Sequence, residues 1–205
     1  MTLLTESEAK QVADKITEVE QHTDAELVAV LARKADDYNY IPTLWAALIA
    51  IVSPGLVLFS PLWVGVADVM IIQMLVFLVL AFLLRIPFIL QRIIPGPVKR
   101  HRASNLAYRQ FLENNLHYTK GETGLLIFVS ETEHYVQIIA DRGISKVVPD
   151  AEWKKIVDHL TGCVKSGKTL LGFLDTVEAC GLLLAEHIPS TGEQDELPNR
   201  LVMLD

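Results

Sequence analysis

Residues 125–140 read LLIFVSETEHYVQIIA, two apolar runs joined by a short polar segment. The first run, Leu125–Val129, is short and apolar throughout, which is typical of a strand buried on both faces. The polar residues Glu131–His134 have the length of a hairpin turn, and Tyr135–Ala140 follows as a second run of apolar and β-branched residues. This stretch therefore predicts a β-hairpin.

The segments on either side of this hairpin predict helices and one further strand. Thr5 begins a capping box that ends at Glu8, and apolar residues at helical spacing follow as far as Val19. Glu26–Leu31 is short and apolar, as expected of another buried strand. Three later segments also show helical spacing: residues 103–116, about 150–160 and about 170–187. Helices combined with buried strands predict an α/β fold.

An apolar block, residues 41–84, interrupts these elements, and Asp68 is its one formal charge. At about 20 residues for each crossing, the block is long enough for two transmembrane helices. We predict passes at residues 41–60 and 66–84, joined by a short turn that contains Trp63. A pair of buried core helices is the alternative, but neither run has the polar stripe of a helix at a globular surface.

Basic residues flank the block on both sides and do not occur in the turn between the passes. Arg33 and Lys34 precede the first pass. The segment 85–102 contributes five more: Arg85, Arg92, Lys99, Arg100 and Arg102. By the positive-inside rule we expect a two-pass protein of the inner (cytoplasmic) membrane with both termini in the cytoplasm. The mixture of apolar and basic residues in 85–102 predicts a juxtamembrane segment along anionic headgroups.

The predicted organisation is one soluble domain made from two separated parts. Residues 1–40 and 103–189 supply these parts, because neither could bury a full core alone. The hairpin 41–84 is tolerated as an insertion because its two ends lie close together. Residues 190–205 form a polar tail, which we expect to be disordered.

Composition narrows the class of partner. The formal net charge of −7 and the isoelectric point near 5.4 argue against nucleic acid, because phosphate binding needs clustered Lys and Arg. The two cysteines, Cys163 and Cys180, are too few for a disulfide framework, so we expect free thiols in a reducing compartment. The first residues contain no apolar run, so we expect no signal peptide.

Residues 162–169, GCVKSGKT, match the phosphate-binding P-loop pattern. A P-loop follows a buried strand, whereas the eleven residues before Gly162 (AEWKKIVDHLT) have the spacing of an amphipathic helix. We therefore interpret Gly162, Gly167, Lys168 and Thr169 as a helix end and turn that match by chance, and predict no nucleotide-binding residues.

Two longer stretches resemble the TPM domain family, named after a thylakoid-lumen protein, a photosystem II repair protein and a nematode receptor modulator. Residues 4–31 (LTESEAKQVADKITEVEQHTDAELVAVL) are similar to the opening helix and strand of that family. Residues 120–157 (KGETGLLIFVSETEHYVQIIADRGISKVVPDAEWKKIV) are similar to its two following strands and the next helix. Five positions fall on the family pattern: Gly124, Gly143, Pro149, Asp150 and Gly172.

The resemblance implies a three-layer α/β, TPM-like domain, here with an inserted two-helix transmembrane hairpin. It also implies either acid phosphatase activity with divalent-cation binding or a purely regulatory role, because members of the family show both. Either role would be exercised at the inner face of the membrane.

Four carboxylates are the predicted metal ligands. Asp36 and Asp37 follow the first strand, Asp141 ends the β-hairpin and Asp150 opens a helix. Ligands of open α/β sheets gather beyond strand ends, and Ca²⁺ or Mg²⁺, the cations expected here, prefer several oxygen ligands. The alternative is that Asp150 caps its helix and that Asp36 and Asp37 are solvated loop charges.

We predict no catalytic residues, because these carboxylates offer a metal Lewis acid without an obvious nucleophile. His159 and Cys163 lie one helical turn apart and could share a metal, but two ligands do not make a site. The favoured hypothesis is a membrane-anchored, non-catalytic or regulatory module that acts on the assembly or turnover of a membrane partner. Its expected partners are the lipid bilayer and another membrane protein or a second copy. The alternative is a divalent-metal-dependent phosphatase.

Overall fold

The computed structural model describes residues 4–59, 65–192 and 197–204. Two compact units make up the chain: Met1–Ala35 with Arg100–Asp205, and Asp36–Lys99. We call them the α/β unit and the helical unit. One α/β unit is therefore assembled from both sides of an inserted helical segment.

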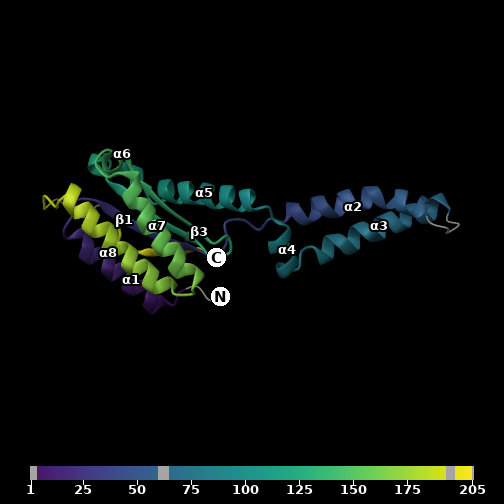
Figure 1. Ribbon diagram of the computed structural model, residues 1–205, viewed down its shortest axis with the longest axis horizontal. Coiled ribbons are helices and arrows are strands. Elements are labelled where there is room, and N and C mark those ends of the chain that lie inside the picture. The colour runs from purple at the N-terminus through teal and green to yellow at the C-terminus, as the bar shows by residue number, and fades with distance from the viewer. Residues whose placement is uncertain (1–3, 60–64, 193–196, 205) are drawn as a thin grey trace. The chain divides into compact units, whose positions relative to one another are not determined.

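A four-stranded sheet forms the centre of the α/β unit, with strand order β3-β2-β1-β4 (Figure 1). Its strands are β1 (Glu26–Ala32), β2 (Gly124–Ser130), β3 (Tyr135–Ala140) and β4 (Leu201–Leu204). β1 lies parallel to β2 and β4, whereas β3 is antiparallel to β2 across the predicted hairpin turn. Every residue of β1 and β2 is buried, as expected of apolar strands covered on both faces.

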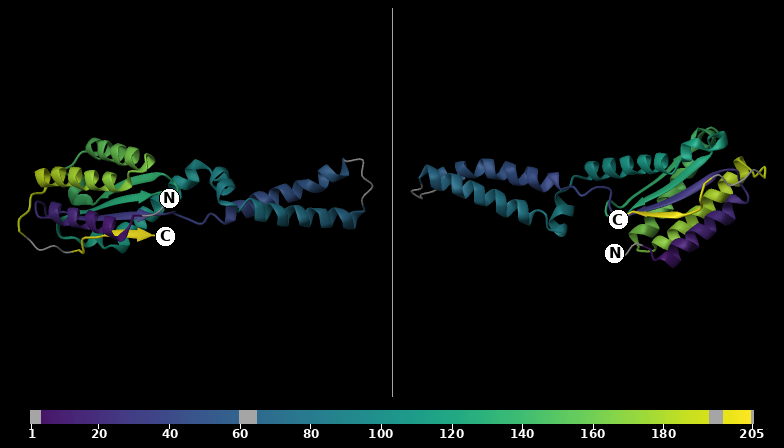
Figure 2. Two further views of the ribbon diagram at one scale, coloured as in Figure 1. Left: turned by 90° about the horizontal axis from the view of Figure 1, so that it is seen from below. Right: turned by 180° about the vertical axis from the view of Figure 1, so that it is seen from behind.

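Helices cover both faces of this sheet and give the unit three layers. Side chains alternate along a strand, so Leu27, Ala29 and Leu31 of β1 face one layer and Val28, Val30 and Ala32 face the other. The first layer contains α1 (Glu6–Glu20), α7 (Asp150–Lys165) and α8 (Thr169–His187). The second contains α5 (Gly96–Glu113), and the right-hand view of Figure 2 shows the sheet between α5 and the pair α1 and α8.

Short helical turns connect the elements at the end of the sheet where β1 and β2 begin. The 3₁₀ turns η1 (Leu116–Tyr118) and η2 (Lys120–Glu122) lead into β2. The one-turn helix α6 (Arg142–Ser145) follows β3. It brings Ile144 into the core before α7 begins.

The prediction of a disordered tail is wrong for residues 197–204. Leu201–Leu204 forms β4, which pairs with β1 from Ala29↔Leu201 to Ala32↔Leu204. Leu201 is buried in the first core layer, and the backbone N–H of Arg33 donates to the carbonyl of Leu204. The apolar sequence LVML therefore covers an edge of β1 that would otherwise expose unpaired backbone groups.

Two long apolar helices form the helical unit. They are α2 (Tyr40–Leu58) and α3 (Val66–Leu83), and they lie side by side in both Figure 1 and Figure 2. The shorter α4 (Pro87–Ile93) follows, and Tyr38, Ile41 and Ile94 form a small buried cluster near it. The predicted turn with Trp63 lies outside the described residues.

Candidate functional site

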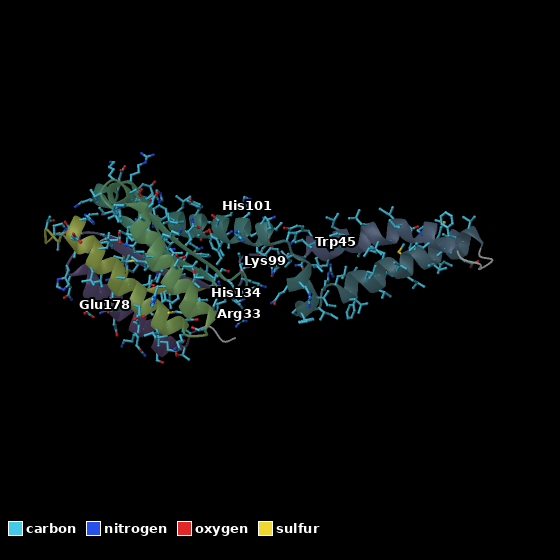
Figure 3. All side chains as sticks on the ribbon, viewed as in Figure 1. Arg33, Trp45, Lys99, His101, His134 and Glu178 are labelled. Atoms are coloured by element: carbon cyan, nitrogen blue, oxygen red, sulfur yellow. The ribbon has the colours of Figure 1, made fainter. Side chains whose placement is uncertain are left out.

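The helical unit exposes a large apolar surface. No residue of α3 (Val66–Leu83) is buried. This helix is almost entirely apolar, since Asp68 is its one charged residue. Large side chains such as Met70 and Phe82 are 67% and 76% exposed. In α2, a little over a quarter of Tyr40–Val57 is buried (28%), and Figure 3 labels Trp45 on this helix, where its side chain is half exposed. Both helices are long and apolar enough to cross a membrane.

Asp68 has a local role at the start of α3. Its Oδ2 accepts a hydrogen bond of 3.0 Å from the backbone N–H of Gly65, the residue that caps the helix. A carboxylate in the first helical turn is also stabilised by the positive end of the helix dipole. The one charge of the apolar block is therefore explained by helix capping.

Three of the four predicted metal ligands follow strands, and these strands end at opposite ends of the sheet. Asp36 and Asp37 follow the carboxyl end of β1, where Ala32 pairs with Ser130. Asp141 follows β3, and because β3 is antiparallel this residue lies at the opposite end, where Leu125 pairs with Ala140. Figure 3 labels Arg33 and His134 at the former end. The carboxyl end of β1 and Asp141 therefore lie at opposite ends of the sheet.

Two of these carboxylates occupy helix starts. Oδ1 of Asp141 accepts a hydrogen bond of 2.8 Å from the backbone N–H of Arg142 and caps α6. Asp150 is the first residue of α7 and is exposed, while Pro149 holds the capping position without a side-chain hydrogen bond. Acidic groups at these positions favour helix formation through the helix dipole.

The GCVKSGKT stretch connects two helices. Gly162 lies inside α7, Gly167 has a left-handed φ of 74° in the turn, and Thr169 is the first residue of α8. A phosphate-binding loop needs a strand before its first glycine, and here that place is taken by a full amphipathic helix.

The turn between α7 and α8 brings a third possible metal ligand, Asp175, close to His159 and Cys163. Nε2 of His159 lies 3.0 Å from Oδ2 of Asp175 in α8 and 3.6 Å from Sγ of Cys163. One ligand atom from each of the three residues lies within 4.8 Å of the others. Among the described residues, this is the cluster of His, Cys, Asp or Glu side chains that has the spacing of a metal site.

Asp175 was missed by sequence reasoning, although the sequence contains a usable signal. His159 and Asp175 are equally distant along the chain from Gly167, which lies in the turn. Residues equally distant from the turn of an antiparallel helical hairpin face each other. Recognising α7 and α8 as such a hairpin would have placed Asp175 opposite His159.

A cavity of about 620 Å³ opens at the end of the sheet where β1 and β2 begin. Glu20, Asp24, Glu26 and Lys120 contribute charged groups to its lining. Asp24 accepts hydrogen bonds from the hydroxyl and the backbone N–H of Thr191, at 2.6 and 2.8 Å, and these bonds lower the pKa of its carboxyl group. The sequence did not single out this cavity.

Comparison with known families matches part of the α/β unit to one family. The family profile described as "TPM domain" matches residues 94–182, which run from α5 into α8. The chain contains a TPM domain. The resemblance deduced from the sequence is therefore confirmed.

The chain is also similar to a solved structure. The NMR structure of the BA42 protein from the psychrophilic bacterium Bizionia argentinensis superposes with a TM-score of 0.60 at 21% identity. The match covers 98% of this chain and 96% of that one. At this identity the likeness shows the fold alone. A search of curated proteins gives no match.

The structure explains two glycines that carried the resemblance to the TPM domain family. A β-carbon on Gly124 would lie 2.2 Å from the carbonyl oxygen of Leu116, and one on Gly143 would lie 2.2 Å from that of Gly121. Both distances are far below van der Waals contact, and the obstacle in each case is backbone that cannot rotate away. The two positions therefore require glycine because the turns η1 and η2 pack directly against them.

Proposed function

We propose that this protein is a membrane-anchored TPM-domain protein whose domain is a regulatory, non-catalytic module. In this proposal the α2–α3 hairpin crosses the inner membrane, and the TPM domain acts in the cytoplasm on the assembly or turnover of a membrane partner. The observation that carries the proposal is the exposure of α3. None of its residues is buried, and so large an exposed apolar surface is unfavourable in water and requires an apolar surrounding such as a bilayer.

The length of α3 fits the proposed crossing. Its 18 residues extend over about 27 Å at 1.5 Å per residue, close to the roughly 30 Å of bilayer hydrocarbon. A pair of core helices in a soluble protein would have to bury this surface against the rest of the chain, which α3 does not do among the described residues.

The segment after α3 supports the proposed orientation. α4 exposes Phe88, which is 74% accessible, and carries Arg92 in its last turn. Nζ of Lys99 donates a hydrogen bond of 2.7 Å to the carbonyl of Gln91. Aromatic and basic side chains together are typical of helices at the cytoplasmic headgroup layer.

A regulatory role fits the TPM domain better than catalysis. Three of the predicted carboxylates follow strands that end at different ends of the sheet, and Asp141 is engaged in capping a helix. A two-helix anchor also leaves long apolar faces free for another transmembrane helix, either from a membrane protein or from a second copy.

Single-cysteine labelling tests the topology. In a background with Cys163→Ser and Cys180→Ala, we would introduce Trp63→Cys into the turn and Ser190→Cys after α8. A membrane-impermeant maleimide should label Trp63→Cys in intact cells and Ser190→Cys only after permeabilisation. Labelling of Ser190→Cys from outside, or extraction of the wild type by alkaline carbonate, would contradict the anchored arrangement.

The regulatory role and the phosphatase alternative are separated by two measurements. A stoichiometric membrane protein should co-purify from native membranes, and replacing residues 40–84 by an unrelated transmembrane hairpin should reduce its recovery. The purified full chain should hydrolyse a chromogenic phosphate ester with Ca²⁺ or Mg²⁺ no faster than the triple variant Asp36→Asn, Asp37→Asn, Asp150→Asn. Faster turnover by the wild type would favour the phosphatase.

A further inference from the structure

We propose that His159, Cys163 and Asp175 form a binding site for Zn²⁺ or a chemically similar divalent transition metal. The site would use Nε2 of His159, Sγ of Cys163 and the carboxylate of Asp175. It lies on the outer side of the α7–α8 pair and is distinct from the carboxylates at the sheet ends, so it goes beyond the proposed membrane-anchored role.

The two helices position these groups. His159 and Cys163 are four residues apart in α7, so their side chains project from one face. α8 returns along α7 after the turn at Gly167 and presents Asp175 to the same face. Ligands on two packed helices are held more firmly than ligands on a loop, because both backbones are fixed by the core residues Leu160 and Phe173.

Two of the three distances between ligand atoms are close to those of a tetrahedral zinc site. For Zn–N of about 2.0 Å and Zn–S of about 2.3 Å in a tetrahedron, the nitrogen and the sulfur should lie about 3.5 Å apart. Nε2 of His159 and Sγ of Cys163 are separated by 3.6 Å. The 3.0 Å between Nε2 and Oδ2 of Asp175 needs to widen by only a few tenths of an ångström for the same metal.

The use of one ring nitrogen favours a metal over a proton relay. In a Cys-His-Asp relay the acid contacts one imidazole nitrogen and the nucleophile contacts the other. Here both Asp175 and Cys163 approach Nε2 of His159. Two donors that approach the same ring nitrogen are placed to share one cation with it.

The donor set selects the class of metal. Thiolate and imidazole ligands prefer Zn²⁺ and its neighbours, whereas Ca²⁺ and Mg²⁺ prefer oxygen alone. The side chains of His159 and Asp175 are 54% and 42% exposed, so the fourth coordination position faces solvent. Water or a ligand from another molecule would complete the tetrahedron.

Cobalt substitution of the purified full chain tests the site. One equivalent of Co²⁺ should give a thiolate-to-metal charge-transfer band that Zn²⁺ abolishes and millimolar Ca²⁺ or Mg²⁺ does not. The variants His159→Ala, Cys163→Ser and Asp175→Asn should each weaken Zn²⁺ binding at least about tenfold in calorimetry. The matched control Asp158→Asn, next to His159 and exposed, should bind like the wild type.

Protection of the thiol provides a second measurement, and its first readout is on the wild type. Zn²⁺ should slow alkylation of Cys163 in the wild type and in Asp158→Asn, and should not slow it in His159→Ala. A cobalt complex without the charge-transfer band would overturn the proposal. Equal Zn²⁺ affinity in the wild type and Cys163→Ser, or unprotected Cys163 at saturating Zn²⁺, would overturn it as well.

Discussion

Gly172 of α8 lies so close to Cys163 of α7 that a β-carbon on the glycine would be 2.7 Å from the β-carbon of Cys163. The same added carbon would lie 2.9 Å from Cδ1 of Leu160, which is fully buried. Gly172 therefore sets how closely the two helices approach at the proposed metal ligands. Asp175 follows three residues later on α8, so this close approach also brings its carboxylate to His159.

Replacing Gly172 by alanine should destabilise the domain. The added methyl group meets the side chains of Cys163 and Leu160, and overpacking of this kind costs roughly 1–3 kcal/mol in the free energy of unfolding. The matched control is Gly162→Ala in α7, where an added β-carbon meets nothing within 4 Å. That variant should gain about 0.5–1 kcal/mol from helix propensity. Urea unfolding followed by circular dichroism measures both, and a stable Gly172→Ala would contradict the packing argument.

The two cysteines should differ sharply in reactivity. Cys180 is fully buried in the core layer, and burial raises the pKa of its thiol to about 12. Its thiolate is therefore scarce at neutral pH, and alkylating reagents cannot reach it. With chelator present, mass spectrometry should find one iodoacetamide adduct in the native chain, on Cys163, and two in denaturant. Native alkylation of Cys163→Ser would show that Cys180 is accessible.

Asp24 should contribute to the acid limit of stability. The hydroxyl and the backbone N–H of Thr191 bond its carboxylate, so its pKa in the folded state lies below the value of about 3.9 in an unfolded chain. A lowered folded pKa means that the stabilisation is present above pH 4 and is lost as the pH falls through the folded pKa. Asp24→Asn should therefore lower stability at pH 7 more than at pH 3.

Thr191→Val provides a control for this pH dependence. It removes the hydroxyl donor and keeps the backbone donor to Asp24, so part of the dependence should remain. The effect is small because the carboxylate is solvent-exposed and screened. If the free energies of unfolding of the wild type and Asp24→Asn changed in parallel between pH 7 and pH 3, Asp24 would not contribute to the acid limit of stability.

Local patterns in the sequence determined most of the fold. The run Leu125–Val129 and the turn Glu131–His134 predicted the β2–β3 hairpin, because strand burial and turn length are local properties. Thr5 and Glu8 predicted the start of α1, and both halves of that capping box are present. The insertion was predictable because residues 41–84 differ in composition from the rest of the chain.

Features that depend on distant contacts were not predicted. β4 is four residues long and pairs with Ala29–Ala32, far away in the sequence, so no local signal reveals it. Asp141 was grouped with Asp36 because both follow strands, but the direction of β3 places it at the other sheet end. Asp175 joins His159 only through the packing of α7 on α8.

Deleting residues 197–205 should destabilise the domain and promote its self-association. The deletion removes the buried Leu201 and exposes the edge of β1, whose seven residues are all buried in the folded chain. A long, apolar, unpaired edge is a template for pairing with another chain. Thermal unfolding should occur at lower temperature, and size-exclusion chromatography in detergent should show larger species. A truncation that ends after Thr191 should behave like the deletion, and wild-type behaviour of either would contradict a structural role for β4.

A positive charge in the middle of α3 should impair membrane insertion. Leu75 is 55% exposed near the centre of Val66–Leu83, and an Arg there costs about 2.5–3.5 kcal/mol in apparent insertion free energy. Leu75→Arg should therefore lower the carbonate-resistant fraction of the protein. Leu182→Arg is the matched control, because Leu182 is 71% exposed on α8 of the TPM domain and should tolerate the charge. If the α3 surface instead docked a soluble protein, carbonate would release the wild type too, and the two variants would not differ in membrane retention.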